Sequence, residues 1–335
     1  DLDAAIAYAY DQGWTDGLPV IPPTDRLVAR FLDAAGLDGD EVLGTIPPRG
    51  VAFTAEKVAA NAVMAGCLPE YMPVVVAAIR AMTDPRFNLH ATCSSTGGAA
   101  HLIVVNGPIA KELGINAGPN VFGQGFRANA TIGRAVQLCL RNIGQALPGL
   151  LDRSTLGNPG KYTLCIAELE EFSPWEPLSV TRGFQPGQNV VTVFATESPQ
   201  YIFNYLSDDP VGILTAIGYK MAGFGNYHHP HGPAENPVVL CPEHVRSIHR
   251  HGWGKEQVRD FLYQAARRSA ADLKRAGKME GPIQPGDEER MIPLVDDPAL
   301  ISIVVAGGHA GGVSAHVPGW AGGRQSRSVS CPITT

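Results

Sequence analysis

Two stretches of this chain carry the same order of sequence features, about 138 residues apart. The first begins at Pro73 with an apolar run and leads to the triplet Asn88-Leu89-His90. The second begins at Pro210 with a similar run and leads to the triplet Asn226-Tyr227-His228. Self-similarity at a nearly fixed offset is typical of an internal repeat. We therefore expect the chain to contain one structural unit twice.

The repeat continues through short apolar runs that end in Gly, Pro or polar residues, a pattern typical of buried strands. These runs cover residues 103–108 and 162–167 in the first copy, and 238–242 and 300–305 in the second. Long helices are predicted over 127–141 and 255–274. Helices that alternate with apolar strands favour an α/β fold. The sequence thus predicts an internal duplication of one α/β unit with pseudo-two-fold symmetry.

A Pro/Gly-rich crossover between Trp175 and Gln188 separates the two copies. The predicted parts are a helical N-terminal arm at 1–37, a first repeat at 38–178, a second repeat at 187–322 and a polar tail at 323–335. Ligands bind by preference in clefts between packed units, so a site is expected at the seam between the repeats. An oligomer is also expected.

Composition argues against several classes of protein. Of the 335 residues, 44% are hydrophobic and 17% charged, which is too apolar for a disordered chain. The net charge is -6 and no dense Lys/Arg run occurs, so nucleic acid is not an expected partner. No run of 18 apolar residues is present, so no membrane span is expected. Six cysteines without Cys-x-x-Cys spacing and the lack of a signal-peptide pattern favour a reduced, cytoplasmic protein.

The strongest local signal is a histidine cluster, His228, His229 and His231, held between prolines. With His90 at the matching place of the first copy, it is a candidate set of ligands for a divalent metal ion of unknown identity. The alternative is a surface turn whose imidazoles have no function. The metal interpretation predicts that His228 or His229 lies close to His309.

Two candidate catalytic residues follow the last predicted strand of each copy. Glu168 is one of three carboxylates after the first, and His309 lies in a glycine-rich segment after the second. Ligands bind at the carboxyl ends of strands in open α/β sheets, so either residue is a candidate base or metal ligand. Three adjacent acids are, however, more often solvated.

Cys93 precedes Ser94, Ser95 and Thr96 and then Gly97 and Gly98. Small residues of this kind can form a nest of N–H groups that lowers the pKa of a thiol or holds an anion. Cys93 is therefore a candidate catalytic residue, and the two glycines are candidates for substrate binding. The alternative is a turn beside a buried, inert cysteine.

The run from Gly123 to Arg134 resembles the GxGxxA dinucleotide fingerprint only weakly, so no nucleotide cofactor is expected. A glycine turn that opens a helix at Arg127 still exposes N–H groups to an anion. Arg127, Asn129 and Arg134 are therefore candidates for binding an anionic substrate. In the alternative interpretation the arginines pair with acids of the protein and contribute to stability.

Several phrases resemble a poorly characterised bacterial family: WTDGLPVIPPT (14–24), NAVMAGCLPEYMPVV (61–75), VNGPI (105–109), RANATIGRA (127–135) and PWEPL (174–178). The similarity extends over nearly the whole chain. Members of that family often occur beside, or fused to, a small protein with a Cys-Gly-Ser-Cys motif whose first cysteine can be selenocysteine. The resemblance implies a small thiol or selenol partner protein, although this chain lacks the motif itself.

Three functional hypotheses follow. The first is a metal-assisted lyase or hydrolase that acts on a small, polar and anionic substrate at the seam. The second is a thiol- or selenol-dependent oxidoreductase subunit that works with the small cysteine-motif partner, through Cys93 or Cys331. The third is a non-catalytic scaffold for that partner.

Overall fold

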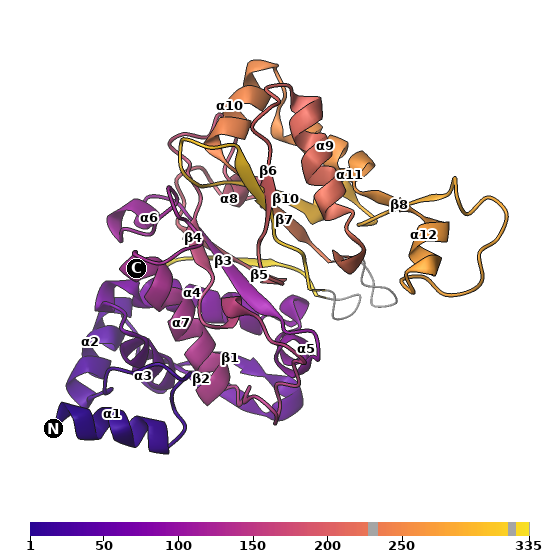
Figure 1. The fold of residues 1–335 in the computed structure, drawn as a ribbon. Coiled ribbons are helices and arrows are strands. Elements are labelled where there is room, and N and C mark those ends of the chain that lie inside the picture. The colour runs from indigo at the N-terminus through magenta and orange to yellow at the C-terminus, as the bar shows by residue number, and fades with distance from the viewer. Residues whose placement is uncertain (227–233, 321–325, 335) are drawn as a thin grey trace.

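The computed structural model describes residues 1–226, 234–320 and 326–334, and in this part the chain is a mixed α/β protein (Figure 1). One sheet contains, in spatial order, β12 (Val329–Pro332), β5 (Val190–Thr196), β3 (Ala100–Asn106) and β4 (Cys165–Ala167). β3 and β4 are parallel, whereas β5 is antiparallel to both of its neighbours. β12 comes from the region that the sequence presents as a polar tail.

A second sheet contains β10 (Ile301–Val305), β7 (Asn236–Leu240), β11 (Val313–His316) and β6 (Gln200–Phe203). β7 and β10 are parallel, and β11 is antiparallel to β7 and β6. Both sheets therefore have one parallel pair, followed by two antiparallel pairings. Two short hairpins complete the strands, β1 (Val42–Ile46) with β2 (Val51–Thr54) and β8 (Arg267–Ser269) with β9 (Met291–Pro293).

The two larger sheets pack face to face. Side chains alternate between the two faces of a strand, and Leu102 and Val104 of β3 join Val239 and Val304 of the other sheet in one buried cluster. The opposite faces bury different side chains, such as Ile103 in one cluster and residues of β7 and β10 in another. The arrangement is a four-layer stack of helices, sheet, sheet and helices.

Helices cover the outer face of each sheet (Figure 1). The first sheet carries α3 (Ala55–Ala65), α4 (Met72–Thr83) and α7 (Arg127–Asn142), and the second α9 (Pro210–Met221), α10 (Pro242–Arg250) and α11 (Lys255–Ala265). α7 buries Ile132, Val136 and Cys139, which are spaced so as to share one helical face. The remaining helices are α1 (Leu2–Asp11), α2 (Asp25–Ala35), α5 (Leu89–Ser94), α6 (Ile109–Glu112), α8 (Leu178–Thr181) and α12 (Ala270–Arg275).

The predicted long helix at 127–141 is confirmed as α7, but the one at 255–274 is wrong. α11 ends at Ala265, and the chain then forms β8 before α12 begins at Ala270. The Ser269 hydroxyl accepts a hydrogen bond from the Asp272 N–H at 3.1 Å, which caps the new helix. The helical pattern of the sequence continues through this break and hides it.

In the described part of the chain, no helix is long and apolar enough to cross a membrane.

Candidate active site

A thiol, an imidazole and a hydroxyl meet at the carboxyl end of β7. Cys241 follows this strand directly and is the N-cap residue of α10, whose first residue is Pro242. His244 lies in the first turn of the same helix, and Ser314 belongs to the neighbouring strand β11. All three residues are at most 3% exposed. The carboxyl ends of parallel strands are where open α/β sheets bind ligands.

Both ring nitrogens of His244 have partners. Nδ1 lies 2.7 Å from the Ser314 hydroxyl, and Nε2 lies 3.0 Å from the backbone carbonyl of Asn204. A carbonyl oxygen only accepts hydrogen bonds, so Nε2 carries a proton and Nδ1 faces the hydroxyl. Asn204 therefore fixes the orientation of the ring, as the third member of a nucleophile–base–orienter set does.

Although burial acts to raise the pKa of the Cys241 thiol, hydrogen bonds and charge attraction from His244 outweigh it and lower that pKa. The backbone N–H of His244 and the Ser314 side chain also contribute donors to the sulfur. Burial acts to lower the pKa of His244, but its interactions with Cys241 and Asn204 raise it. The pair therefore favours a thiolate beside an imidazolium.

Cys241 differs in this respect from the other five cysteines. Burial raises the pKa of Cys67 to about 12 and that of Cys93 to about 11. It also raises the pKa values of Cys139, Cys165 and Cys331. All six thiols are free. Cys241 is therefore the cysteine whose surroundings favour nucleophilic chemistry.

A glycine-rich loop, residues 306–312, passes over this site. The Gly311 N–H donates to the Glu243 carboxylate at 2.7 Å, and the Gly307 N–H donates to the Ala117 carbonyl at 2.8 Å. A Cβ atom at Gly312 would lie 2.2 Å from the Asn204 carbonyl oxygen and 2.9 Å from His244 Nε2. Only glycine lets the backbone come this close to the oriented imidazole.

Two adjoining cavities lie beside the site. One of about 240 Å³ is lined by Ser314, Gly307 and Ala306 together with side chains of the other half of the chain. The second, of about 410 Å³, shares part of its wall with the first. The shared residues are Val121, Phe122, Gly123 and Tyr201. Of the three reactive residues, Ser314 borders the first cavity, whereas Cys241 and His244 line neither.

Glu168 is fully buried at the junction of the two sheets. Its carboxylate accepts from the Asn106 side-chain amide at 2.8 Å and from the Leu178 N–H at 2.6 Å. The ammonium group of Lys255, on α11, lies 3.6 Å away, and burial lowers the pKa of this lysine. Glu168 therefore occupies a hydrogen-bonded buried ion pair between the halves.

The predicted metal ligands are only partly within the described residues. His90 lies on α5, and its Nδ1 is buried without a hydrogen-bond partner among the described residues. His309 is exposed and packs edge-on against Phe172, with ring centroids 5.0 Å apart. The predicted ligands His228, His229 and His231 lie outside the described residues. Within the described ranges, no three His, Cys, Asp or Glu residues form a group that could hold a metal ion.

Cys93 lies in a different cavity, of about 230 Å³, together with His101, Asp152 and Lys161. Burial lowers the pKa of His101 to about 3, so this imidazole is neutral near pH 7. Lys161 pairs with Asp152 at 2.5 Å. Gly98 packs against the Gly157 backbone, since a Cβ atom there would lie 2.9 Å from the Gly157 carbonyl oxygen, and Gly97 next to it is exposed; neither glycine lines this cavity.

The three candidates for substrate binding on α7 all have protein partners. Arg127 donates through Nε and Nη2 to the Gly66 carbonyl, at 3.1 and 3.0 Å. The Asn129 side chain joins Asn116 to the Cys165 carbonyl and is 4% exposed.

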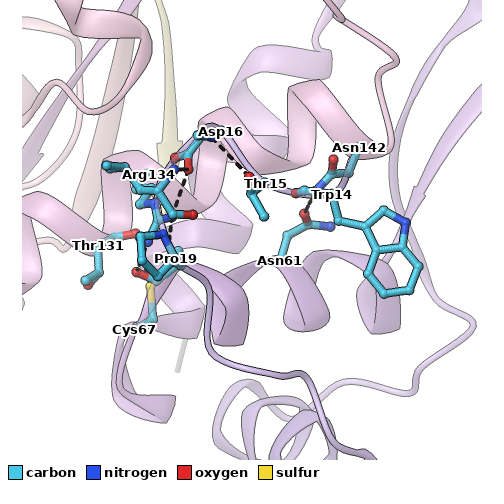
Figure 2. A network of polar contacts seen from close by, with 12 residues as sticks. Trp14, Thr15, Asp16, Pro19, Asn61, Cys67, Thr131, Arg134 and Asn142 are labelled. Atoms are coloured by element: carbon cyan, nitrogen blue, oxygen red, sulfur yellow. Dashed lines mark hydrogen bonds and ion pairs between the residues drawn. The ribbon is translucent and has the colours of Figure 1, made fainter. Parts of the chain in front are cut away.

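Arg134 forms a two-pronged ion pair with Asp16, with both distances 2.8 Å (Figure 2). It also donates to the Pro19 carbonyl at 2.9 Å, and so ties the N-terminal arm to α7. Nearby, Asn142 donates to the Trp14 carbonyl and to the Asn61 side chain (Figure 2). These contacts correspond to the alternative in which the arginines serve the protein itself.

The sequence interpretation did not single out Cys241, His244 or Ser314. A usable signal is present, because the apolar run at 238–240 leads directly into Cys-Pro-Glu-His. A cysteine before a helix-opening proline, with a histidine three residues later, places both side chains at one helix start. No local pattern marks Ser314, which reaches the site through strand pairing.

Comparison with known proteins gives no matching family model, no matching curated protein and no matching solved structure.

Proposed function

We propose that the protein is a thiol-dependent hydrolase that transfers the acyl group of a small molecule to Cys241 and then to water. The observation that supports this most strongly is the Cys241–His244–Ser314 set, of which Ser314 borders a cavity. The pKa of its thiol is lowered and that of its imidazole is raised. A thiolate with an adjacent, oriented histidine is the pattern of covalent catalysis by cysteine.

In the proposed reaction the Cys241 thiolate attacks the carbonyl carbon of an ester or thioester. The His244 imidazolium then gives its proton to the leaving alcohol or thiol as the acyl–enzyme forms. Neutral His244 next removes a proton from water, which attacks the acyl group and releases the carboxylic acid and the thiol. In the first turn of α10, Pro242 has no N–H and the His244 N–H faces the sulfur, so the Glu243 N–H is the backbone donor of this turn that can stabilise the oxyanion.

The metal-assisted lyase or hydrolase expected from the sequence stays a separate proposal. Its support is the histidine cluster in the sequence and the buried Nδ1 of His90, which has no hydrogen-bond partner in the part of the chain that the structure describes. Its ligand set depends on His228, His229 and His231. Metal analysis of the purified protein tests it independently of Cys241.

Thiol exchange with a small partner protein is the second candidate function. The groups found on the Cys241 sulfur among the described residues are His244 and Ser314, and neither is a thiol. A redox cycle at Cys241 would therefore take its second thiol or selenol from a partner, as the family resemblance implies. A mixed disulfide between Cys241 and such a partner would support this candidate over hydrolysis.

We also infer that the chain arose by duplication of one α/β unit. The support is that β4-β3-β5-β12 and β10-β7-β11-β6 share the same order of parallel and antiparallel pairings. The equivalent strands β3 and β7, and β4 and β10, follow the sequence offsets of the repeat. In this scheme Cys241 and Asn106 hold related positions at the ends of their strands.

Hydrolysis of p-nitrophenyl acetate tests the proposed function. The wild-type protein and the Cys331→Ala control should release p-nitrophenol at the same rate. Cys241→Ala should reduce kcat/KM by about a thousandfold or more, because loss of a catalytic nucleophile can cost on the order of a millionfold in rate. If Cys241→Ala keeps full activity with its fold intact by circular dichroism, the proposal is wrong. Loss of activity in Ser314→Ala but not in Cys241→Ala would instead make serine the nucleophile.

A further inference from the structure

The two adjoining cavities, the smaller of which is bordered by Ser314, form a cleft with an unusual lining for the site of a polar substrate. The first cavity is lined by small, apolar and aromatic residues, with Asn120 and Ser314 as its polar side chains. The second adds Gln124, Asn129, Thr163 and Ser198, besides apolar groups and backbone. Among the described residues, neither cavity is lined by the side chain of an Asp, Glu, Lys, Arg or His.

Arg127 and Arg134, which the sequence suggested as ligands for an anionic substrate, do not supply a charge to the cleft. Arg127 is bound to the Gly66 carbonyl, and Arg134 is bound to Asp16. Neither residue lines the two cavities. A charged ligand group placed in the larger cavity, which none of Cys241, His244 and Ser314 lines, would lose hydration without gaining an ionic partner there, which is costly.

Several polar side chains of the lining already form hydrogen bonds within the protein. Asn129 uses both its oxygen and its nitrogen on backbone groups, and Asn120 donates to the Gln124 carbonyl at 2.9 Å. The Ser198 hydroxyl donates to Asn158 at 2.8 Å. Aromatic surface from Phe122 and Tyr201 remains, and both residues line both cavities. Tyr201 is 54% exposed, so it forms the outer rim of the cleft.

We propose that the substrate of this site is an uncharged ester or thioester with an apolar group that lies against Phe122 and Tyr201. This rests on the proposed function and replaces the anionic substrate expected from the sequence. The reacting carbonyl lies in the smaller cavity beside Ser314, and the apolar group extends into the larger one. Release of the carboxylic acid creates a negative charge in an uncharged cleft, which favours departure of the product.

Two esters with the same leaving group test the substrate class. p-Nitrophenyl butyrate is neutral, whereas p-nitrophenyl hemisuccinate carries a carboxylate on an acyl chain of similar length. The neutral ester should have a kcat/KM about tenfold higher or more, because the charged acyl chain must be desolvated without a partner. A hemisuccinate that reacts as fast as the butyrate overturns the proposal.

Two matched arginine substitutions test whether the preference for the neutral ester arises in the cleft. Tyr201→Arg adds a cation at the rim, which can pair with the carboxylate of the hemisuccinate. The kcat/KM values of the two esters should then lie within about threefold of each other. The preference is reduced but not reversed, because a partly exposed ion pair contributes little free energy. Tyr219→Arg is the control, because Tyr219 is similarly exposed on α9 but lines neither cavity. A preference that survives Tyr201→Arg unchanged contradicts the assigned cleft.

Binding to the Cys241→Ala protein separates this inference from the proposed function. The probes are the inert anilides N-(4-nitrophenyl)butanamide and N-(4-nitrophenyl)succinamic acid, with isothermal titration calorimetry as the measurement. Tighter binding of the neutral anilide supports the substrate class even where the wild-type protein hydrolyses neither ester. Binding of neither anilide, or tighter binding of the anionic one, overturns the substrate class.

Discussion

Nδ1 of His244 and the hydroxyl of Ser314 lie 2.7 Å apart, although 70 residues separate them in the chain. Pairing of β11 with β7 brings the hydroxyl to the start of α10. There it meets the imidazole and the thiol of Cys241, whose N–H donates to the same hydroxyl at 3.1 Å. The reactive groups thus come from one strand and one helix start, which are regular elements of the fold.

The pH profile of hydrolysis should be bell-shaped. Activity requires a thiolate, so it rises as Cys241 loses its proton, below the ordinary thiol pKa of about 8.5. It also requires a protonated His244, so it falls as pH rises through a pKa above about 6.5. His244→Asn should remove the falling limb as well as most of the rate. Initial rates measured from about pH 5 to about pH 10 cover both limbs of the profile. A profile with no dependence on His244 contradicts the dyad.

The Asp16–Arg134 pair should contribute to stability rather than to catalysis. The two side chains are 13% and 15% exposed, so Asp16→Asn should lower the free energy of unfolding by about 1–3 kcal/mol. kcat/KM should not change. Urea denaturation measures the loss, and Glu171→Gln, in the exposed pair with Lys111, is the control expected to leave the midpoint unchanged.

The contribution of the Asp16–Arg134 pair to the free energy of unfolding should also depend on pH. Although burial acts to raise the pKa of Asp16, its bonds with Arg134 lower it. A carboxylate with a lowered folded pKa stabilises the fold above its unfolded pKa of about 3.9, and loses that effect as pH falls through the folded value. The difference in the free energy of unfolding between the wild-type protein and Asp16→Asn should therefore become smaller in acid. A constant difference down to about pH 2 would falsify the ion-pair explanation.

The Glu168–Lys255 pair should show strong coupling. Its side chains are 0% and 8% exposed, so removal of one partner leaves an uncompensated buried charge. Lys255→Met and Glu168→Gln should each reduce the free energy of unfolding by about 3–5 kcal/mol. The double variant should lose much less than the sum of the two. Additive losses in guanidinium denaturation would show that the two groups do not interact.

Metal removal distinguishes the two hydrolase proposals. The thiol proposal predicts that dialysis against EDTA leaves kcat/KM unchanged, since no step of the reaction at Cys241 uses a metal. The metal proposal predicts about one bound ion per chain and loss of activity with it. Elemental analysis of the protein before and after dialysis, with activity measured on the same samples, decides between them.

The α/β character of this protein could be predicted because strands buried on both faces read as unbroken apolar runs. The runs that become β3, β4, β7 and β10 show this pattern, and α7 shows a helical one. The break between α11 and α12 could not be predicted in this way, because a capping serine interrupts an otherwise continuous helical pattern. β12 was hidden too, since its edge position leaves polar Ser330 and Cys331 half exposed.

The site was harder to predict than the fold. The prediction weighted histidines and glycines by their local density, and so favoured residues near His228 and Cys93. The reactive set instead depends on one helix start and on a hydroxyl from β11, which only strand pairing brings together. Arg127 and Arg134 looked suited to an anion, but tertiary contacts with Gly66 and Asp16 use their donors.

The pH dependence of alkylation tests the central claim most directly. Each cysteine is identified by mass spectrometry after brief treatment of the folded protein with iodoacetamide at a series of pH values. Cys241 should be modified with a midpoint below the ordinary thiol pKa of about 8.5, and His244→Gln should move that midpoint upward. Cys331, whose pKa burial raises, is the internal control and should react only at higher pH. A Cys241 midpoint at or above that of Cys331, unchanged in His244→Gln, would contradict the assignment of Cys241 as the nucleophile.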